Sequence, residues 1–200
     1  MSLFSSEDHF GVDSPKGYIP TTLLRRMFLE APSMAVGLKR MLSVPRHVSV
    51  NMTAVSGEGA GEAVNIELTP NHRFISYPSV NTDIYSHSNR FKSEHFMANS
   101  SVDDTYICGS SLYRDRRFEK LLTEKFGSID EHVFETALKD HFGFPDSVCF
   151  HLPDKDREDM STYPNMCTIA CITCNLTKKT LRVCRGTPCS GKFQQFTFTR

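Results

Sequence analysis

Apolar residues in this 200-residue chain switch between helical and strand spacing, and this change of period limits the fold more than any other feature. Residues 20–29 and 34–42 carry apolar side chains every three or four positions, which predicts two helices, the second capped by Ser33. Residues 47–55 and 62–68 alternate apolar with polar side chains, which predicts two strands joined by a glycine-rich turn.

The second half of the chain repeats the order of helices followed by strands. Helical stripes at residues 112–126 and 129–142 predict a second helical pair. Two further strands are expected before this helical pair, at residues 73–77 and 83–87. Four more are expected after it, at residues 147–151, 166–174, 180–184 and 192–199. Because helices and strands are grouped separately, the sequence predicts an α+β fold. Residues 1–17 are polar and predict a loop leading into the domain.

Composition excludes several classes of protein. The 23 basic and 23 acidic residues alternate without a stripe of one sign, so we expect neither a nucleic-acid nor a membrane partner. An apolar fraction of 39% fits a single domain over residues 1–200. The chain shows no signal-peptide pattern, and its 7 cysteines are an odd number. Both features favour free thiols in a reducing compartment, so we expect a cytoplasmic location.

Short motifs occur in a fixed order along the chain and resemble those of one family. They are Gly17-Tyr18-Ile19-Pro20 with Leu23-Leu24-Arg25-Arg26, Glu62-Ala63-Val64-Asn65-Ile66-Glu67, His87-Ser88-Asn89-Arg90-Phe91, Asp140-His141 with Ser147-Val148-Cys149, and Gly186-Thr187-Pro188-Cys189. Together they resemble the penicillin acyltransferase-like family (acyl-coenzyme A:6-aminopenicillanic acid acyltransferases) of the N-terminal-nucleophile (Ntn) hydrolases. Its relatives include insect β-alanyl-dopamine hydrolases.

The resemblance implies an αββα layered sandwich of which this chain covers the C-terminal portion, incomplete on the N-terminal side. It also implies self-cleavage before a cysteine whose new α-amine, with a pKa of about 8, serves as the base for its own thiol. The implied reaction is cleavage of the C–N bond of a small N-acyl amine, or acyl transfer from a thioester. No cofactor and no metal are expected.

In the family the nucleophile precedes the segment that resembles residues 17–26, whereas the first cysteine of this chain is Cys108. We therefore expect the catalytic cysteine to lie in an N-terminal segment or subunit of the same precursor, and the chain alone to be inactive. The alternative is a shortened, catalytically inactive paralogue with a structural or interaction role. Cys108 as a replacement nucleophile has no supporting motif around it.

The resemblance matches Asn89 to an asparagine whose side-chain amide donates to the oxyanion of the tetrahedral intermediate. The alternative for Asn89 is an Asx-turn at the end of a strand. His87 is expected to orient or pack beside Asn89. Asn165, shortly before Thr168, stands where the penicillin enzymes have an arginine near the active site. Because a neutral amide lacks a permanent charge, the substrate is not expected to carry a penicillin-type carboxylate.

The cysteines allow a third hypothesis, a zinc site at Cys171 and Cys174 with Cys184 and Cys189 following. Residues three apart on a strand point to opposite faces, so we do not expect a metal site. Cys167 and Cys171 share a face, and we expect them to be buried free thiols. Asp140 and His141 with Cys149 also suggest a catalytic arrangement. A histidine at a helix C-terminus interacts favourably with the orphan carbonyls, however, and this local role is the one we expect.

Overall fold

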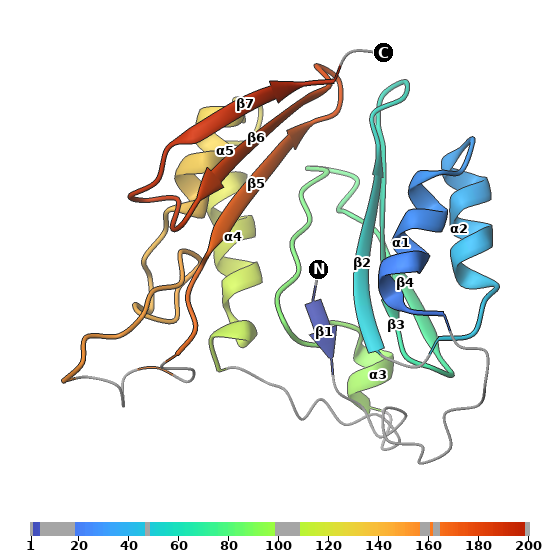
Figure 1. The fold of residues 1–200 in the computed structure, drawn as a ribbon, viewed down its shortest axis with the longest axis horizontal. Coiled ribbons are helices and arrows are strands. Elements are labelled where there is room, and N and C mark those ends of the chain that lie inside the picture. The colour runs from blue at the N-terminus through green and yellow to red at the C-terminus, as the bar shows by residue number, and fades with distance from the viewer. Residues whose placement is uncertain are drawn as a thin grey trace. The chain divides into compact units, whose positions relative to one another are not determined.

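The computed structural model describes residues 2–4, 19–46, 49–98, 109–156, 161 and 165–198, and the chain divides into two compact units. The first unit comprises Met1–Pro78 with Asn89–Ile107, and the second comprises Ser79–Ser88 with Cys108–Arg200. Each unit has one antiparallel sheet and its own helices (Figure 1). The predicted α+β class is therefore confirmed.

The sheet of the first unit has the strand order β1-β2-β3-β4. Its strands are β1 (Ser2–Phe4), β2 (Ser49–Ser56), β3 (Glu62–Leu68) and β4 (Arg73–Ser76), and its helices are α1 (Thr21–Leu29), α2 (Met34–Leu42) and α3 (Glu94–Ala98). The Ser33 hydroxyl accepts a hydrogen bond from Val36 N at 3.3 Å, so the predicted cap begins α2.

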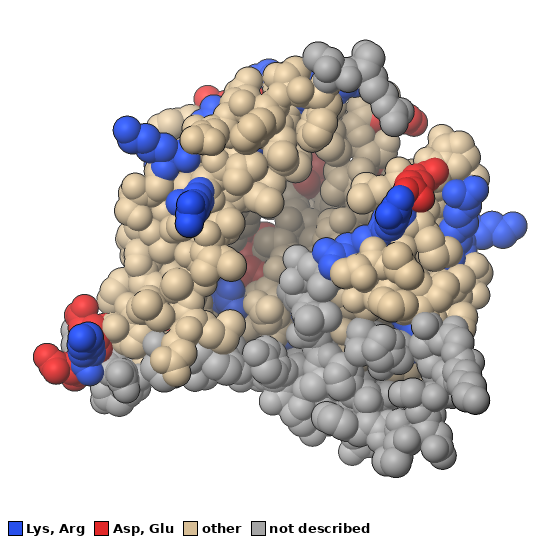
Figure 2. All heavy atoms as spheres, in the orientation of Figure 1, with Lys and Arg blue, Asp and Glu red and all other residues tan. Residues whose placement is uncertain are grey.

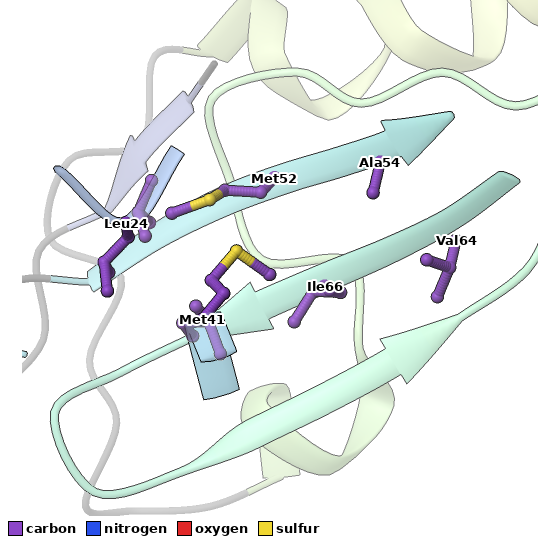
Figure 3. Packing of buried hydrophobic residues seen from close by; sticks show 8 residues of the cluster. Leu24, Met41, Met52, Ala54, Val64 and Ile66 are labelled. Carbon is purple, nitrogen blue, oxygen red and sulfur yellow. The ribbon is translucent and has the colours of Figure 1, made fainter. Parts of the chain in front are cut away.

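The core of the first unit lies between this sheet and the α1–α2 pair. Figure 3 shows Met52 and Ala54 of β2 and Val64 and Ile66 of β3, which form one buried cluster with side chains of both helices. The full cluster is Leu24, Met41, Val50, Met52, Ala54, Val64, Ile66 and Leu68. Complete burial of a Leu, Ile or Met side chain contributes about 1.5–3 kcal/mol, so this alternating face determines how the helices dock.

The second unit has the strand order β5-β6-β7. Its strands are β5 (Ala170–Asn175), β6 (Thr180–Arg185) and β7 (Phe193–Thr197), and its helices are a 3-10 turn (Gly109–Leu112), α4 (Arg114–Thr123) and α5 (Glu131–Leu138). The rings of Phe118 and Phe134 join α4 to α5 with centroids 5.3 Å apart. Glu135 of α5 pairs with Arg182 of β6 at 2.7 Å, which holds this helix against the sheet.

Two predicted strands are wrong. Residues 83–87 form no strand, because Asp83 has a φ of +51° and Ser86 N donates to the Glu119 carboxylate instead of to a neighbouring strand. Residues 147–151 form no strand either. Cys149 N donates to Asp140 O at 3.0 Å, so this segment folds back on the loop that precedes it.

Other boundaries differ from the prediction in smaller ways. The loop leading into the domain contains β1, and residues 5–18 lie outside the described part. The loop at 88–109 contains α3, and the second predicted helix ends at Leu138 instead of residue 142. His141 is therefore in a loop and not in the last helical turn, so the expectation that placed it at the helix end is corrected.

On the face that Figure 2 shows, basic and acidic side chains of the described residues stand in small separate groups. This distribution agrees with the balanced charge of the sequence. None of the helices in the described part of the chain is both long and apolar enough to cross a lipid bilayer.

Candidate functional site

The face of the first sheet opposite its helices carries polar side chains, several of which are buried. Thr53 of β2 donates to Asn65 Oδ1 at 2.8 Å, and Asn65 Nδ2 donates to Ser76 of β4 at 3.4 Å. Asn51 is only 3% exposed, and its Oδ1 has no hydrogen-bond partner among the residues that the structure describes. A buried polar atom without a partner costs about 1–3 kcal/mol, so this face retains an unused acceptor.

Glu67 of β3 fastens a returning segment of chain to the same unit. Its carboxylate, in a residue that is 1% exposed, accepts hydrogen bonds from the backbone N–H groups of Lys92 and Ser93, the latter at 3.0 Å. Phe91 and Phe96 of this segment are buried with ring centroids 5.0 Å apart. The segment that begins at residue 89 is therefore held by charge-assisted bonds and by an aromatic pair.

The boundary between the two units falls between Ser88 and Asn89. Asn89 is half-buried and lies two residues before Phe91, at the start of the anchored segment. The half-buried His87 donates from Nδ1 to the carbonyl of Ser88 at 2.7 Å, and its ring stacks on Tyr85. The predicted oxyanion role of Asn89 remains a prediction.

Asn165 and Thr168 lie in the second unit, and Thr168 makes two hydrogen bonds to Phe150. Asn165 is exposed. Thr168 N donates to Phe150 O at 2.9 Å, and Phe150 N donates to Thr168 Oγ1 at 3.0 Å. Thr168 therefore fixes the short stretch between Cys149 and His151.

That stretch belongs to a cluster that the sequence patterns did not indicate. The side chains of His141, Cys149, His151 and Cys189 bring their ring nitrogens and sulfurs within 4.8 Å of one another. His151 Nε2 lies 3.0 Å from His141 Nε2, 3.2 Å from Cys149 Sγ and 3.5 Å from Cys189 Sγ. Cys149 is buried, His151 is half-buried, and the other two residues are exposed.

Two loops of the second unit carry this cluster. The first loop, residues 139–151, is closed by the bonds from Cys149 N to Asp140 O and from His151 N to Pro145 O, at 3.0 and 2.9 Å. The second loop, residues 186–191, turns at Gly186, which has a φ of +83°. Gly191 N donates to Thr187 O at 2.9 Å, so a tight turn holds Cys189 in place.

An ion pair with Arg117 of α4 holds the side chain of Asp140, the residue before His141. Arg117 binds both oxygens of the Asp140 carboxylate, with Nη2 at 2.7 Å and Nε at 3.1 Å, and its guanidinium lies 5.2 Å from the Phe142 ring. Burial acts to raise the pKa of Asp140, but the hydrogen bonds from Arg117 and from Phe142 N, with the nearby positive charge, together outweigh it and hold that pKa below its usual value. Asp140 is therefore engaged with Arg117, which argues against the catalytic arrangement of Asp140, His141 and Cys149.

The ionisation of Cys149 argues against this sulfur as an unassisted nucleophile. Burial raises the pKa of the Cys149 thiol to about 12, so without a bound cation this sulfur is a neutral thiol near neutral pH. Burial and the nearby His141 lower the pKa of His151, which favours the neutral imidazole with a free lone pair.

Cys167 and Cys171, which the sequence predicts to be buried thiols, are both half-buried. Cys171 of β5 lies directly opposite Cys184 of β6 in the strand register, and both thiols are free. Cys171 is half-buried and Cys174 is exposed, in line with the alternation expected along β5. His151 was not considered from the sequence, and the signal that could have found it is the H-x7-C-x-H spacing of residues 141–151. Cys108 lies outside the described residues.

Comparison with known proteins assigns the chain to no family. The chain matches no family model, and no curated protein matches it either. The family resemblance described above therefore remains a prediction, and the activity attached to it is a proposal.

Proposed function

We propose that this chain is part of a cysteine Ntn amide hydrolase or acyltransferase. In this proposal Asn89 donates its side-chain amide to the oxyanion that forms when an amide or thioester carbonyl is attacked. The nucleophile is a cysteine outside the 200 residues, in an N-terminal segment of the same precursor. The substrate is a small N-acyl amine or an acyl-thioester, and water or an amine resolves the thioester intermediate.

The observation that carries the proposal is the anchoring of the segment that Asn89 begins. Lys92 is held by the Glu67 carboxylate, and three residues of chain span at most about 11 Å, so Asn89 starts within that reach of a fixed point. An oxyanion donor is effective when it is positioned before the reaction starts, because no reorganisation is then needed. Burial of Phe91 limits the movement of the same segment.

We further propose that the two sheets stack as the inner layers of an αββα sandwich. In each unit helices cover one face of the sheet, and in the second unit the other face exposes apolar side chains. Ile172 is 60% exposed and Phe196 is 51% exposed on that face. A sheet face of this kind is usually covered in a folded protein, and a second sheet is the cover that the family layering supplies.

Two further points limit the substrate and the setting. Asn165 is neutral and exposed, so a carboxylate-bearing penicillin-type substrate is not proposed. The cysteines that the structure describes are all free, which supports a reducing, cytoplasmic setting.

The test requires the complete reading frame, recovered by sequencing the transcript upstream of Met1. The encoded protein is assayed on a panel of N-acyl amines by release of free amine, and on acyl-coenzyme A thioesters by release of thiol. Asn89→Ala is expected to lower kcat by about a hundredfold or more, the usual loss when one oxyanion donor is removed. The matched control is Asn81→Ala, at an exposed loop position, which should leave kcat unchanged.

Three outcomes count against the proposal. An in-frame stop directly upstream of Met1 in every transcript, together with an inactive protein, would favour the structural or interaction paralogue. Unchanged kcat in Asn89→Ala would remove this residue from the site. Equal losses in Asn89→Ala and Asn81→Ala would assign the effect to stability and not to the oxyanion.

A further inference from the structure

We propose that His141, Cys149, His151 and Cys189 bind one zinc ion, which joins the loop at residues 139–151 to the loop at residues 186–191. The four side chains all belong to the second unit and come from two loops separated by β5 and β6. This site is independent of the proposed amide chemistry and uses none of its residues.

The separations of the ligand atoms suit a tetrahedral ion. With Zn–N of about 2.1 Å and Zn–S of about 2.3 Å, tetrahedral geometry places ligand atoms about 3.3–3.8 Å apart. The three separations from His151 Nε2 are 3.0, 3.2 and 3.5 Å. Shifts of a few tenths of an ångström bring these three separations to tetrahedral values. The four ligand atoms lie within 4.8 Å of one another, so the widest separation must close by about 1 Å for all four to surround one centre.

A hydrogen-bond network explains the same geometry less well. A neutral imidazole nitrogen carries either one lone pair or one N–H in the ring plane, so it can serve one partner well. His151 Nε2 nevertheless has the nitrogen of His141 and the sulfurs of Cys149 and Cys189 within 3.5 Å. A cation at the centre of the four atoms gives each of them its own bond.

The ligand set selects the metal and its role. Two thiolates and two imidazoles are typical of zinc, and four protein ligands leave no open position for water or substrate. Binding replaces two S–H bonds with two Zn–S bonds and releases two protons to solvent, which gives a centre with no net charge. A neutral centre suits a site that includes the fully buried Cys149. The ion is therefore structural and fastens the two loops together.

The surrounding contacts hold the ligands in place before an ion arrives. The Arg117–Asp140 pair fixes the residue before His141, and Thr168 bonds to both backbone groups of Phe150, between Cys149 and His151. Such supporting contacts affect metal affinity by about 10–100-fold in known sites. His141 and Cys189 are exposed, so an ion can reach these two ligands from solvent.

The experiment uses the full 200-residue chain, purified with a reductant and without chelators. Metal content is measured by elemental mass spectrometry, and the metal-free protein is titrated with zinc against a competing chelator. We expect about one zinc per chain, and cobalt substitution should give the strong d–d absorption and thiolate charge-transfer bands of a four-coordinate thiolate site.

The variants test exposed ligands, which can be changed with the least risk to folding. His141→Gln and Cys189→Ser should each weaken zinc binding by about a hundredfold or more, since a direct ligand matters at least as much as a supporting contact. His132→Gln and Cys174→Ser are the matched controls, because both change an exposed residue of the same type in the same unit. Far-UV circular dichroism establishes that each variant is folded.

Three results would overturn the proposal. The first is a folded, reduced wild-type chain that retains no zinc after gel filtration. The second is a Cys149–Cys189 disulfide in protein purified with zinc present, which peptide mass spectrometry would detect. The third is zinc that is lost equally in the control variants, which would assign the metal to other cysteines.

Discussion

At the scale of single residues, the first unit contains buried polar groups as well as an apolar core. Glu67 lies on β3 between apolar neighbours that face the helices, and its carboxylate points the other way to accept two backbone N–H groups. A charged residue that is 1% exposed is uncommon unless it is bonded in this way. The sequence marks Glu67 only as part of a motif and does not indicate its hydrogen-bond partners, because they lie 25 and 26 residues away.

Replacement of Glu67 tests this role. Glu67→Ala leaves the N–H groups of Lys92 and Ser93 without their acceptor, so we expect the free energy of unfolding to fall by about 3 kcal/mol. Urea unfolding followed by circular dichroism measures the change. The control is the exposed Glu58→Ala, expected within about 0.5 kcal/mol of the wild type. A loss in Glu67→Ala no larger than in this control would contradict the assigned role.

At the scale of elements, most helices and strands were predictable where one period persists. Helices α1 and α2 and strands β2 and β3 lie within two residues of their expected ends, because each buries one continuous face. The strand predicted at residues 147–151 was wrong, because the backbone hydrogen bonds of this segment join it to Asp140, Pro145 and Thr168. An apolar run alone does not reveal whether those partners are in a strand or a loop.

The N-cap of α5 offers a test at this scale. Asp130 accepts a hydrogen bond from Val133 N at 2.7 Å, and α5 leads into the loop that carries His141. Asp130→Ala should lower the free energy of unfolding by about 1 kcal/mol, and Asp130→Ser should recover most of the loss. Thermal unfolding of both variants checks this expectation, and equal losses in Ala and Ser would show that the cap is not responsible.

The packing of α2 against α1 offers a second test at this scale. A Cβ added at Gly37 would lie 2.7 Å from the Phe28 ring and 3.0 Å from the Phe28 carbonyl oxygen. Gly37→Ala is therefore expected to destabilise the first unit by about 1–3 kcal/mol, even though alanine is the better helix former. Lys39→Ala, an exposed change on the same helix, should have little effect in the same urea titration. Stabilisation by Gly37→Ala would contradict this packing.

At the scale of the whole molecule, the chain consists of two units, and different interactions hold the loops of each unit in place. The first unit relies on Glu67 and the Phe91–Phe96 pair, and the second on the Arg117–Asp140 ion pair and the proposed zinc site. A ligand that binds only the folded form stabilises the part of the molecule that contains its site. Zinc should therefore affect one unit and leave the other unchanged.

Hydrogen exchange measured by mass spectrometry can separate the two units. Removing zinc with a chelator should speed exchange in residues 139–151 and 186–191, while peptides from β2 and β3 should be unchanged. The same chelator added to His141→Gln should have no effect on either region. Faster exchange throughout the chain, or none anywhere, would show that the ion does not fasten these loops.

The sequence by itself determined the α+β class, the grouping of helices and strands, and the Ser33 cap, because these depend on neighbours within a few residues. It also marked Asn89 and the His141 and Cys149 motif without indicating what they contact. Only the tertiary structure decided that Cys189 lies 3.5 Å from a histidine 38 residues earlier in the chain. That contact depends on how β5 and β6 return the chain, and side-chain spacing along the sequence carries no information about it.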